Sequence, residues 1–222
     1  MLHIKESKEE TNENFDITPL EKSKIKESFE RININDYKTL MHHLAVIVIF
    51  SAAATGSSVA LLFIPNLETL TLFIFFVAFI YGYKTGFIMM INTVLIYEFF
   101  ASSFYGTAGY LMPFKLFGFS IAVIVAVSVR KTVFSSKLDL IKVTNGNRLL
   151  FASMGLCITV FYDLITSLSY LVIFQNIEIF LILLITGLPF TLFHELTNFF
   201  IFLLVPELIV IHTRIINSEI VE

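Results

Sequence analysis

The chain begins with a polar stretch over residues 1–40 and then alternates long apolar runs with short polar interruptions. An apolar run of about 20 residues is long enough to cross the hydrocarbon core of a bilayer as a helix. The pattern therefore predicts an all-α, polytopic membrane protein with a bundle of six transmembrane helices. The predicted spans are 43–64, 67–82, 87–104, 112–129, 149–174 and 178–205.

The polar stretch at residues 1–40 mixes acidic and basic side chains, a composition typical of a solvated, flexible tail. Within it, Lys22 to Arg31 can form a short surface helix. Two interpretations stay open, a docking segment and a tail of no special role. The membrane domain is predicted at 41–214, and residues 215–222 are predicted to form a second tail.

Composition supports a membrane location. Hydrophobic residues make up 56% of the 222 residues, and the mean hydropathy is +0.82. A soluble domain does not need that much apolar surface, so the expected environment is a lipid bilayer. We therefore expect a multi-pass protein of the cell membrane. The net charge of -3 indicates no nucleic-acid partner, and the single cysteine, Cys157, cannot form an internal disulfide.

The basic residues orient the predicted helices. Cytoplasmic loops of membrane proteins carry an excess of Lys and Arg. With both termini in the cytoplasm, the cytoplasmic segments hold seven basic residues before residue 41, Lys84, five in 130–148, and Arg214. Only Lys115 then lies on the outer side. We therefore expect both termini to be cytoplasmic and the outer loops to be short.

Several polar side chains interrupt the apolar runs. A carboxylate or a basic side chain at the centre of a membrane helix costs about 2.5–3.5 kcal/mol, so such groups usually face a bundle interior. One interpretation is an outward-opening substrate cavity between the spans at 87–104, 149–174 and 178–205. The other is that the groups bond one another and hold the bundle together. The helix spacing places them in three stripes: Glu98 and Ser102; Asp163, Thr166 and Tyr170; and Thr191, His194 and Asn198 with Glu195 beside them.

The cavity interpretation is favoured for the outer groups, Glu98, Ser102, Tyr105 and Tyr170. For Asp163, Glu195 and Asn198, ligand binding and bundle stabilisation remain equally open.

Motifs for other chemistries are missing or incomplete. His194 and Glu195 begin a sequence like the HExxH zinc helix, but position 198 is Asn where the second histidine would stand. The sequence contains neither a Walker phosphate loop nor a GxSxG nucleophile motif. We expect no metal, no cofactor and no ATP hydrolysis by this chain itself.

Small residues at Ala52, Gly56 and Ala60 share one face of the first predicted span. Such a face lets another helix backbone approach closely. Packing within this chain and docking to another membrane protein are both open.

Four segments together resemble the substrate-binding S component of an energy-coupling factor (ECF) transporter, over residues 43–206. Their order and spacing in a chain of this length are similar to the family pattern. These segments are the Gly-rich turn Tyr81 to Phe87, the stretch from Glu98 to Phe117, the stretch from Phe161 to Thr166, and the stretch from Gly187 to Asn198.

The resemblance implies a subunit that captures a vitamin or similar micronutrient from outside, through the outer halves of helices and the outer loops. It extends the expected binding set to Asn66, Tyr110 and Asn176 in those loops, and to His194. It also implies a transmembrane coupling protein and two cytoplasmic ABC ATPases as partners. The face at Ala52, Gly56 and Ala60 resembles the docking surface of the family's first helix.

Two other classes remain as alternatives. One is a membrane-embedded enzyme that uses Asp163, His194 and Glu195 at a water-accessible point. The other is a structural membrane protein without a small-molecule ligand. Acidic groups in the predicted cavity point to a cationic or hydrogen-bond-rich ligand.

Overall fold

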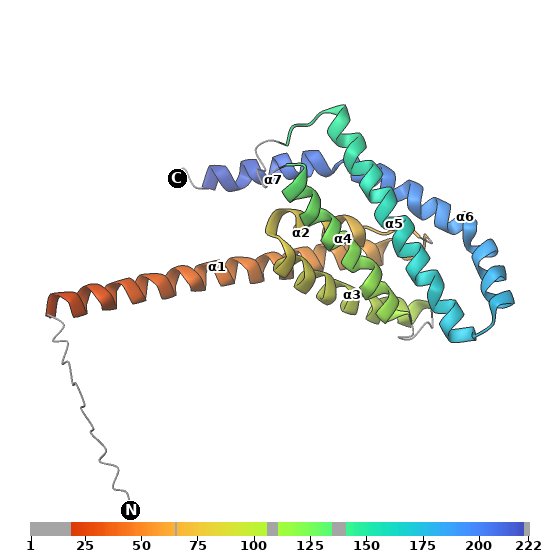
Figure 1. Ribbon diagram of the computed structural model, residues 1–222, viewed down its shortest axis with the longest axis horizontal. Helices are drawn as coiled ribbons and strands as arrows, with labels where there is room; N and C mark the ends of the chain where they lie inside the picture. Colours follow the sequence, from red (N-terminus) through yellow and green to blue (C-terminus); the bar gives the residue numbers. More distant parts are fainter. Residues whose placement is uncertain (1–18, 65, 106–110, 135–140, 220–222) are drawn as a thin grey trace, which may run out of the picture. The chain divides into compact units, whose positions relative to one another are not determined.

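The computed structural model describes residues 19–64, 66–105, 111–134 and 141–219, and every regular element in these ranges is a helix (Figure 1). The all-α prediction is therefore confirmed. The chain divides into two compact units, Met1–His43 and Leu44–Glu222. The second unit holds the end of α1 and all the later helices, and it contains everything described below about a site. The helices are α1 (Pro19–Ala60), α2 (Leu70–Tyr81), α3 (Tyr83–Tyr105), α4 (Met112–Thr132), α5 (Asn145–Phe174), α6 (Ile177–Phe202) and α7 (Val205–Glu219).

The first helix is longer than the apolar pattern predicts. α1 begins at Pro19, so the predicted tail is helical from that residue onward, and the expected short helix at Lys22 to Arg31 lies inside α1. Neither Gly nor a further Pro interrupts the chain between Pro19 and Gly56, and Lys and Glu are good helix formers. Helix propensity therefore explains why α1 extends through the polar residues before the first apolar run.

The second helix is short and lies in the centre of the core. α2 has 12 residues, which gives a length of about 18 Å, less than the roughly 30 Å of a bilayer core. It ends at Gly82, whose φ of 86° is in the left-handed region that glycine tolerates. The Arg130 guanidinium donates to the carbonyl oxygens of Phe79 and Ile80 at 3.0 and 2.5 Å. These hydrogen bonds satisfy carbonyl groups in the last turn of α2, where partners within the helix run out.

Five segments are long and apolar enough to cross a membrane, within the described part of the chain. The remaining predicted span, 67–82, was expected to be short for a full crossing, and it forms the short helix α2. Five candidate spans still define a multi-pass helical membrane protein. They are Tyr37–Ala60, Tyr83–Phe104, Met112–Thr132, Asn145–Phe174 and Ile177–Ile215, the last comprising α6 with most of α7.

Phenylalanine side chains fill the centre of the second unit. The ring centroid of Phe75 on α2 lies 5.2 Å from that of Phe202 at the end of α6. Phe79, one turn further along α2, lies 5.5 Å from Phe151 on α5. All four rings are fully buried. Edge-to-face packing of this kind adds to the burial of each ring and fixes α2 against both α5 and α6.

α5 and α6 form an antiparallel hairpin (Figure 1). α5 begins four residues before the predicted start, where the Thr144 hydroxyl accepts from the Asn147 amide at 3.2 Å. At the hairpin turn, Gln175 adopts a left-handed φ of 50°, and the Asn176 side chain caps α6. α6 bends along its course, and the internal Pro189 removes one backbone donor from it (Figure 1).

The last helix replaces the predicted end of the sixth span. α6 ends at Phe202, and α7 starts at Val205 with Pro206 in its first turn, where the missing donor costs nothing. His212 of α7 hydrogen-bonds the Tyr81 hydroxyl at 3.0 Å, and Arg148 forms an ion pair with Glu207. These contacts attach α7 to the ends of α2 and α5.

Candidate functional site

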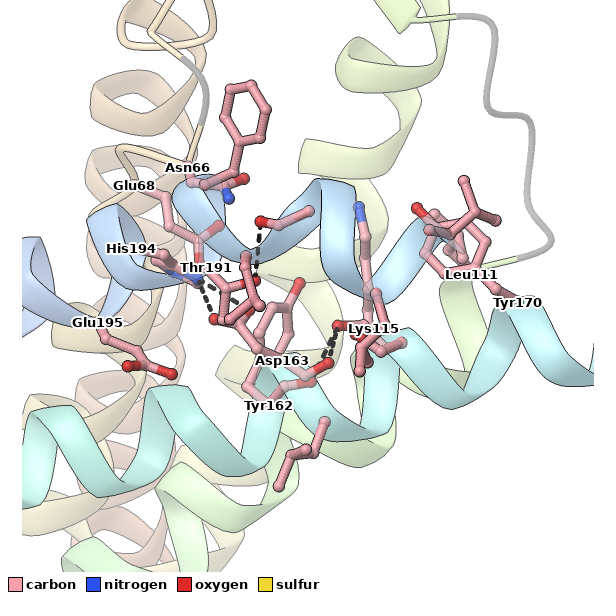
Figure 2. A pocket seen from close by; sticks show the side chains of 18 of the residues that line it. Asn66, Glu68, Leu111, Lys115, Tyr162, Asp163, Tyr170, Thr191, His194 and Glu195 are labelled. Carbon is pink, nitrogen blue, oxygen red and sulfur yellow. Dashed lines mark hydrogen bonds and ion pairs between the residues drawn. The ribbon is translucent and has the colours of Figure 1, made fainter. Parts of the chain in front are cut away.

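One cavity of about 940 Å³ opens among the helices of the second unit (Figure 2). Its wall is contributed by the loop between α1 and α2, by α3, by the first turn of α4, and by facing stretches of α5 and α6. Most of the wall is apolar or aromatic. Its charged and titratable side chains, with the tyrosines, are Glu68, Tyr97, Lys115, Tyr162, Asp163, Tyr170, His194 and Glu195.

The loop after α1 is held in place by hydroxyl groups of that helix. Ser58 Oγ accepts from the Thr69 amide at 3.1 Å, and the hydroxyls of Ser57 and Thr69 are 2.6 Å apart. Asn66 takes a left-handed φ of 58°, which asparagine tolerates better than most residues. This turn directs Glu68 into the bundle, where it is only 8% exposed.

His194 lies between two carboxylates from different segments (Figure 2). Its Nδ1 is 3.0 and 3.2 Å from the two carboxylate oxygens of Asp163 on α5. Its Nε2 is 3.4 Å from Glu68 Oε1 and makes no hydrogen bond within the described part of the chain. Thr71 donates to the same Glu68 oxygen at 3.3 Å. The imidazole therefore joins α5, α6 and the loop before α2 at one buried point.

The charge of this cluster follows from its geometry. Each approach of a ring nitrogen to a carboxylate oxygen needs one proton between the atoms, because two lone pairs would otherwise face each other. Two protons shared by one imidazole and two carboxyl groups leave a single net negative charge. The result is the same for an imidazolium with two carboxylates and for a neutral imidazole with one protonated carboxyl group.

A second ion pair lies on the α3 and α4 side of the cavity. Lys115 Nζ is 2.5 Å from Glu98 Oε1, and the Glu98 residue is 4% exposed. The same ammonium lies 6.0 Å from the centroid of the Tyr97 ring, within the range of a cation–π contact. Glu98 is thus neutralised inside the bundle by the one lysine expected on the outer side.

Tyr162 forms the floor between these two charged groups. Its ring packs on Phe119 with a centroid distance of 4.5 Å and meets the His194 ring edge-on at 5.8 Å. Gly118 makes room for it, since a Cβ there would lie 2.7 Å from a Tyr162 ring carbon. This packing fixes the α5 backbone at the residue next to Asp163.

The cavity collects half of the residues that the sequence predicted for binding. Asn66, Asp163, Thr166, Tyr170, His194 and Glu195 all line it. Glu98 does not line the cavity itself but forms an ion pair with Lys115, which does. Tyr105 is the last residue of α3, and its side chain is not described. Tyr110 lies outside the described residues.

Three further predicted binding residues do not line the cavity. The Ser102 hydroxyl donates to the Phe99 carbonyl of its own helix at 3.1 Å. Asn176 caps α6 by accepting from the amides of Glu178 and Ile179 at 2.8 and 3.2 Å. Asn198 is fully buried below the cavity, and its amide atoms have no hydrogen-bond partner in the described part of the chain. Spacing places a residue on a helix face but does not give the depth at which the cavity ends.

Glu68, Lys115 and Tyr162 were missed from the site. Glu68 is close in sequence to an expected outer loop, where a glutamate is unremarkable, and only the left-handed turn at Asn66 brings it inward. Lys115 did carry a signal, because it is the only basic residue on the predicted outer side. A lone lysine at the start of an apolar helix indicates a nearby carboxylate.

The small-residue face points away from the rest of the second unit. Ala52, Gly56 and Ala60 are exposed, while the opposite side of α1, including Ala54 and Ser58, is buried. A Cβ at Gly56 would meet nothing within 4 Å. Packing of this face within the described chain is therefore excluded.

Among the described residues, no group of three or more His, Cys, Asp or Glu side chains has a geometry that could hold a metal ion. His194 and Glu195 are adjacent on α6, but only His194 reaches the carboxylates of Asp163 and Glu68.

Comparisons with known proteins add no relative. No protein-family model, no curated protein and no solved structure matches the chain. The class is therefore defined by the fold and composition alone: a multi-pass helical membrane protein with a charged cavity among its helices.

The contact between Asp163 and His194 predicts a measurable coupling. In a double-mutant cycle of Asp163→Asn and His194→Gln, we expect a coupling energy of about 0.5–2 kcal/mol, because both residues share one buried contact. Reversible unfolding in mixed detergent micelles measures it. A cycle of Ser102→Ala with His194→Gln is the control and should give a value near zero. An equal, near-zero coupling in both cycles would contradict the described geometry.

Proposed function

We propose that this protein is the substrate-capture subunit of an ECF-type uptake transporter, which binds a vitamin-like micronutrient from the outer face. The observation that carries the proposal is the charged cavity inside a bundle whose outer surface is apolar. Charged groups kept at membrane depth usually mark a substrate or ion pathway. The cavity volume of about 940 Å³ is at the upper end of the range for small-molecule sites.

The distribution of basic residues favours an outward-facing cavity. Arg130 and Lys131 end α4, and Lys131 lies 5.2 Å from the Tyr83 ring at the start of α3, so these basic ends meet at one side of the bundle. The cavity is lined by the opposite ends of the helices, near Lys115 and Tyr170. With the basic side in the cytoplasm, as the positive-inside rule requires, the cavity faces outward.

The exposed face of α1 suits a partner within the membrane. Small residues allow close helix contact, and this face is covered by nothing in the second unit. A transmembrane coupling protein docked there, bearing two ABC ATPases, would supply the energy that this chain has no motif to provide.

The geometry of His194 favours binding over catalysis. A general base needs a ring nitrogen within reach of a nucleophile or a substrate proton. Here Nδ1 faces Asp163, and Nε2 faces Glu68 Oε1 at 3.4 Å. A membrane enzyme that uses Asp163, His194 and Glu195 remains the alternative, and it predicts turnover of the bound molecule.

Native mass spectrometry tests the capture function. Protein gently extracted from its own host should retain a small molecule of micronutrient size. Asp163→Asn should lower the bound fraction at least about tenfold, corresponding to about 1.4 kcal/mol, because it disrupts the polar wall. The matched control Ser153→Ala lies on the exposed side of α5 and should bind normally. Absence of any bound compound, together with no thermal shift across a vitamin panel, would contradict capture.

A bulky side chain at Gly56 should separate capture from transport. Gly56→Leu adds volume to the exposed small-residue face, so we expect loss of the copurifying coupling protein and ATPases, with the bound ligand unchanged. Affinity purification followed by proteomics and native mass spectrometry gives both readouts. Ser153→Leu, an equally exposed change on α5, should keep the partners. Retention of all partners in Gly56→Leu would contradict docking through α1.

A further inference from the structure

We infer that the cavity takes an organic cation with an apolar body, and that Glu195 is the counter-ion for its positive group. This inference rests on the proposed capture function and names the chemical class of the captured molecule.

The first step is the charge of the cavity. With one proton at each of its two imidazole–carboxylate contacts, the cluster of Glu68, Asp163 and His194 carries a single net negative charge. Lys115 and Glu98 neutralise each other. Glu195 adds a second negative charge when ionised, so the wall is negative in either state of Glu195. A binding site without a compensating cation favours a ligand that brings one.

The second step is the position of Glu195. It lies on α6 beside His194 and lines the cavity (Figure 2). Every other charged group on the wall has a partner within 4 Å, but Glu195 has no hydrogen bond or ion pair in the described part of the chain. A carboxylate left unpaired at membrane depth is costly, and a bound ammonium group would offset that cost.

An independent polar atom also points to a ligand. His194 is 4% exposed, lines the cavity, and keeps its Nε2 without a hydrogen bond among the described residues. Its nearest described acceptor, Glu68 Oε1, lies 3.4 Å away, longer than a good N–H···O hydrogen bond, so a closer hydroxyl or carbonyl oxygen on a bound molecule would satisfy this nitrogen better.

The walls decide between an organic and an inorganic cation. The described residues include no cluster with metal-binding geometry. Leucine, isoleucine and aromatic side chains form most of the lining, and they favour an apolar body. Tyrosine faces also attract ammonium groups, as Tyr97 already does with Lys115.

Three compounds with one indole body test the inference: tryptamine, a cation; tryptophol, a neutral alcohol; and indole-3-propionate, an anion. Isothermal titration of the full chain in lipid nanodiscs, freed of copurified ligand, measures each affinity. Tryptamine should bind at least about tenfold more tightly than the other two, as expected for a desolvated charge pair. The preference should fall in Glu195→Gln, which leaves only the negative charge of the Glu68, Asp163 and His194 cluster, and should persist undiminished in Glu195→Asp.

Glu178→Gln is the matched control, because Glu178 is an exposed glutamate in the first turn of the same helix, outside the cavity. It should leave the tryptamine preference unchanged. The inference is overturned if tryptophol or indole-3-propionate binds as tightly as tryptamine, or if Glu195→Gln retains the preference undiminished. Binding of none of the three also overturns it. The native mass spectrum of the wild-type protein decides separately whether the cavity captures a ligand, so the two proposals can fail independently.

Discussion

The contact of one buried imidazole with two carboxylates is the interaction on which the site depends. Taking such groups out of water is expensive, and the expense is offset only while all three stay together. His194 comes from α6, Asp163 from α5 and Glu68 from the loop before α2. No two of these segments can separate without leaving a charge unpaired in an apolar bundle.

The rest of the fold supplies the rigid frame for that contact. α2 is too short to span a bilayer, and its phenylalanines hold α5 and α6 at fixed positions. The Ser58 and Thr69 hydroxyls fix the loop that carries Glu68. Tyr162, packed on Phe119 beside Gly118, fixes the position of the neighbouring Asp163 on α5. Each of these elements lies outside the charged cluster but determines one of its distances.

Apolar run length and helix spacing predicted the all-α bundle and the facing stripes on α5 and α6, because both depend on local periodicity. Asp163 and His194 could be placed on inward faces for this reason. The inward position of Glu68 depends on the left-handed conformation of Asn66. Asparagine tolerates this conformation but does not require it, so the sequence alone does not predict the turn. The helix from Pro19 was missed because hydropathy does not report helix propensity, whereas the short apolar run at 67–82 was predicted and forms the buried 12-residue helix α2. Asn176 shows the converse case, since a helix cap and a ligand-binding amide look alike in sequence.

The central claim is that the cavity is open to water on the outer side of the membrane. Cysteine accessibility tests it most directly, in a Cys157→Ser background that removes the only native thiol. Thr191 lines the cavity, whereas its neighbour Leu192 is 53% exposed on the apolar outer surface of α6 and does not line it. In right-side-out vesicles, a membrane-impermeant thiol reagent should modify Thr191→Cys and spare Leu192→Cys. Modification of Thr191→Cys only from the cytoplasmic side, or from neither side, would contradict the account.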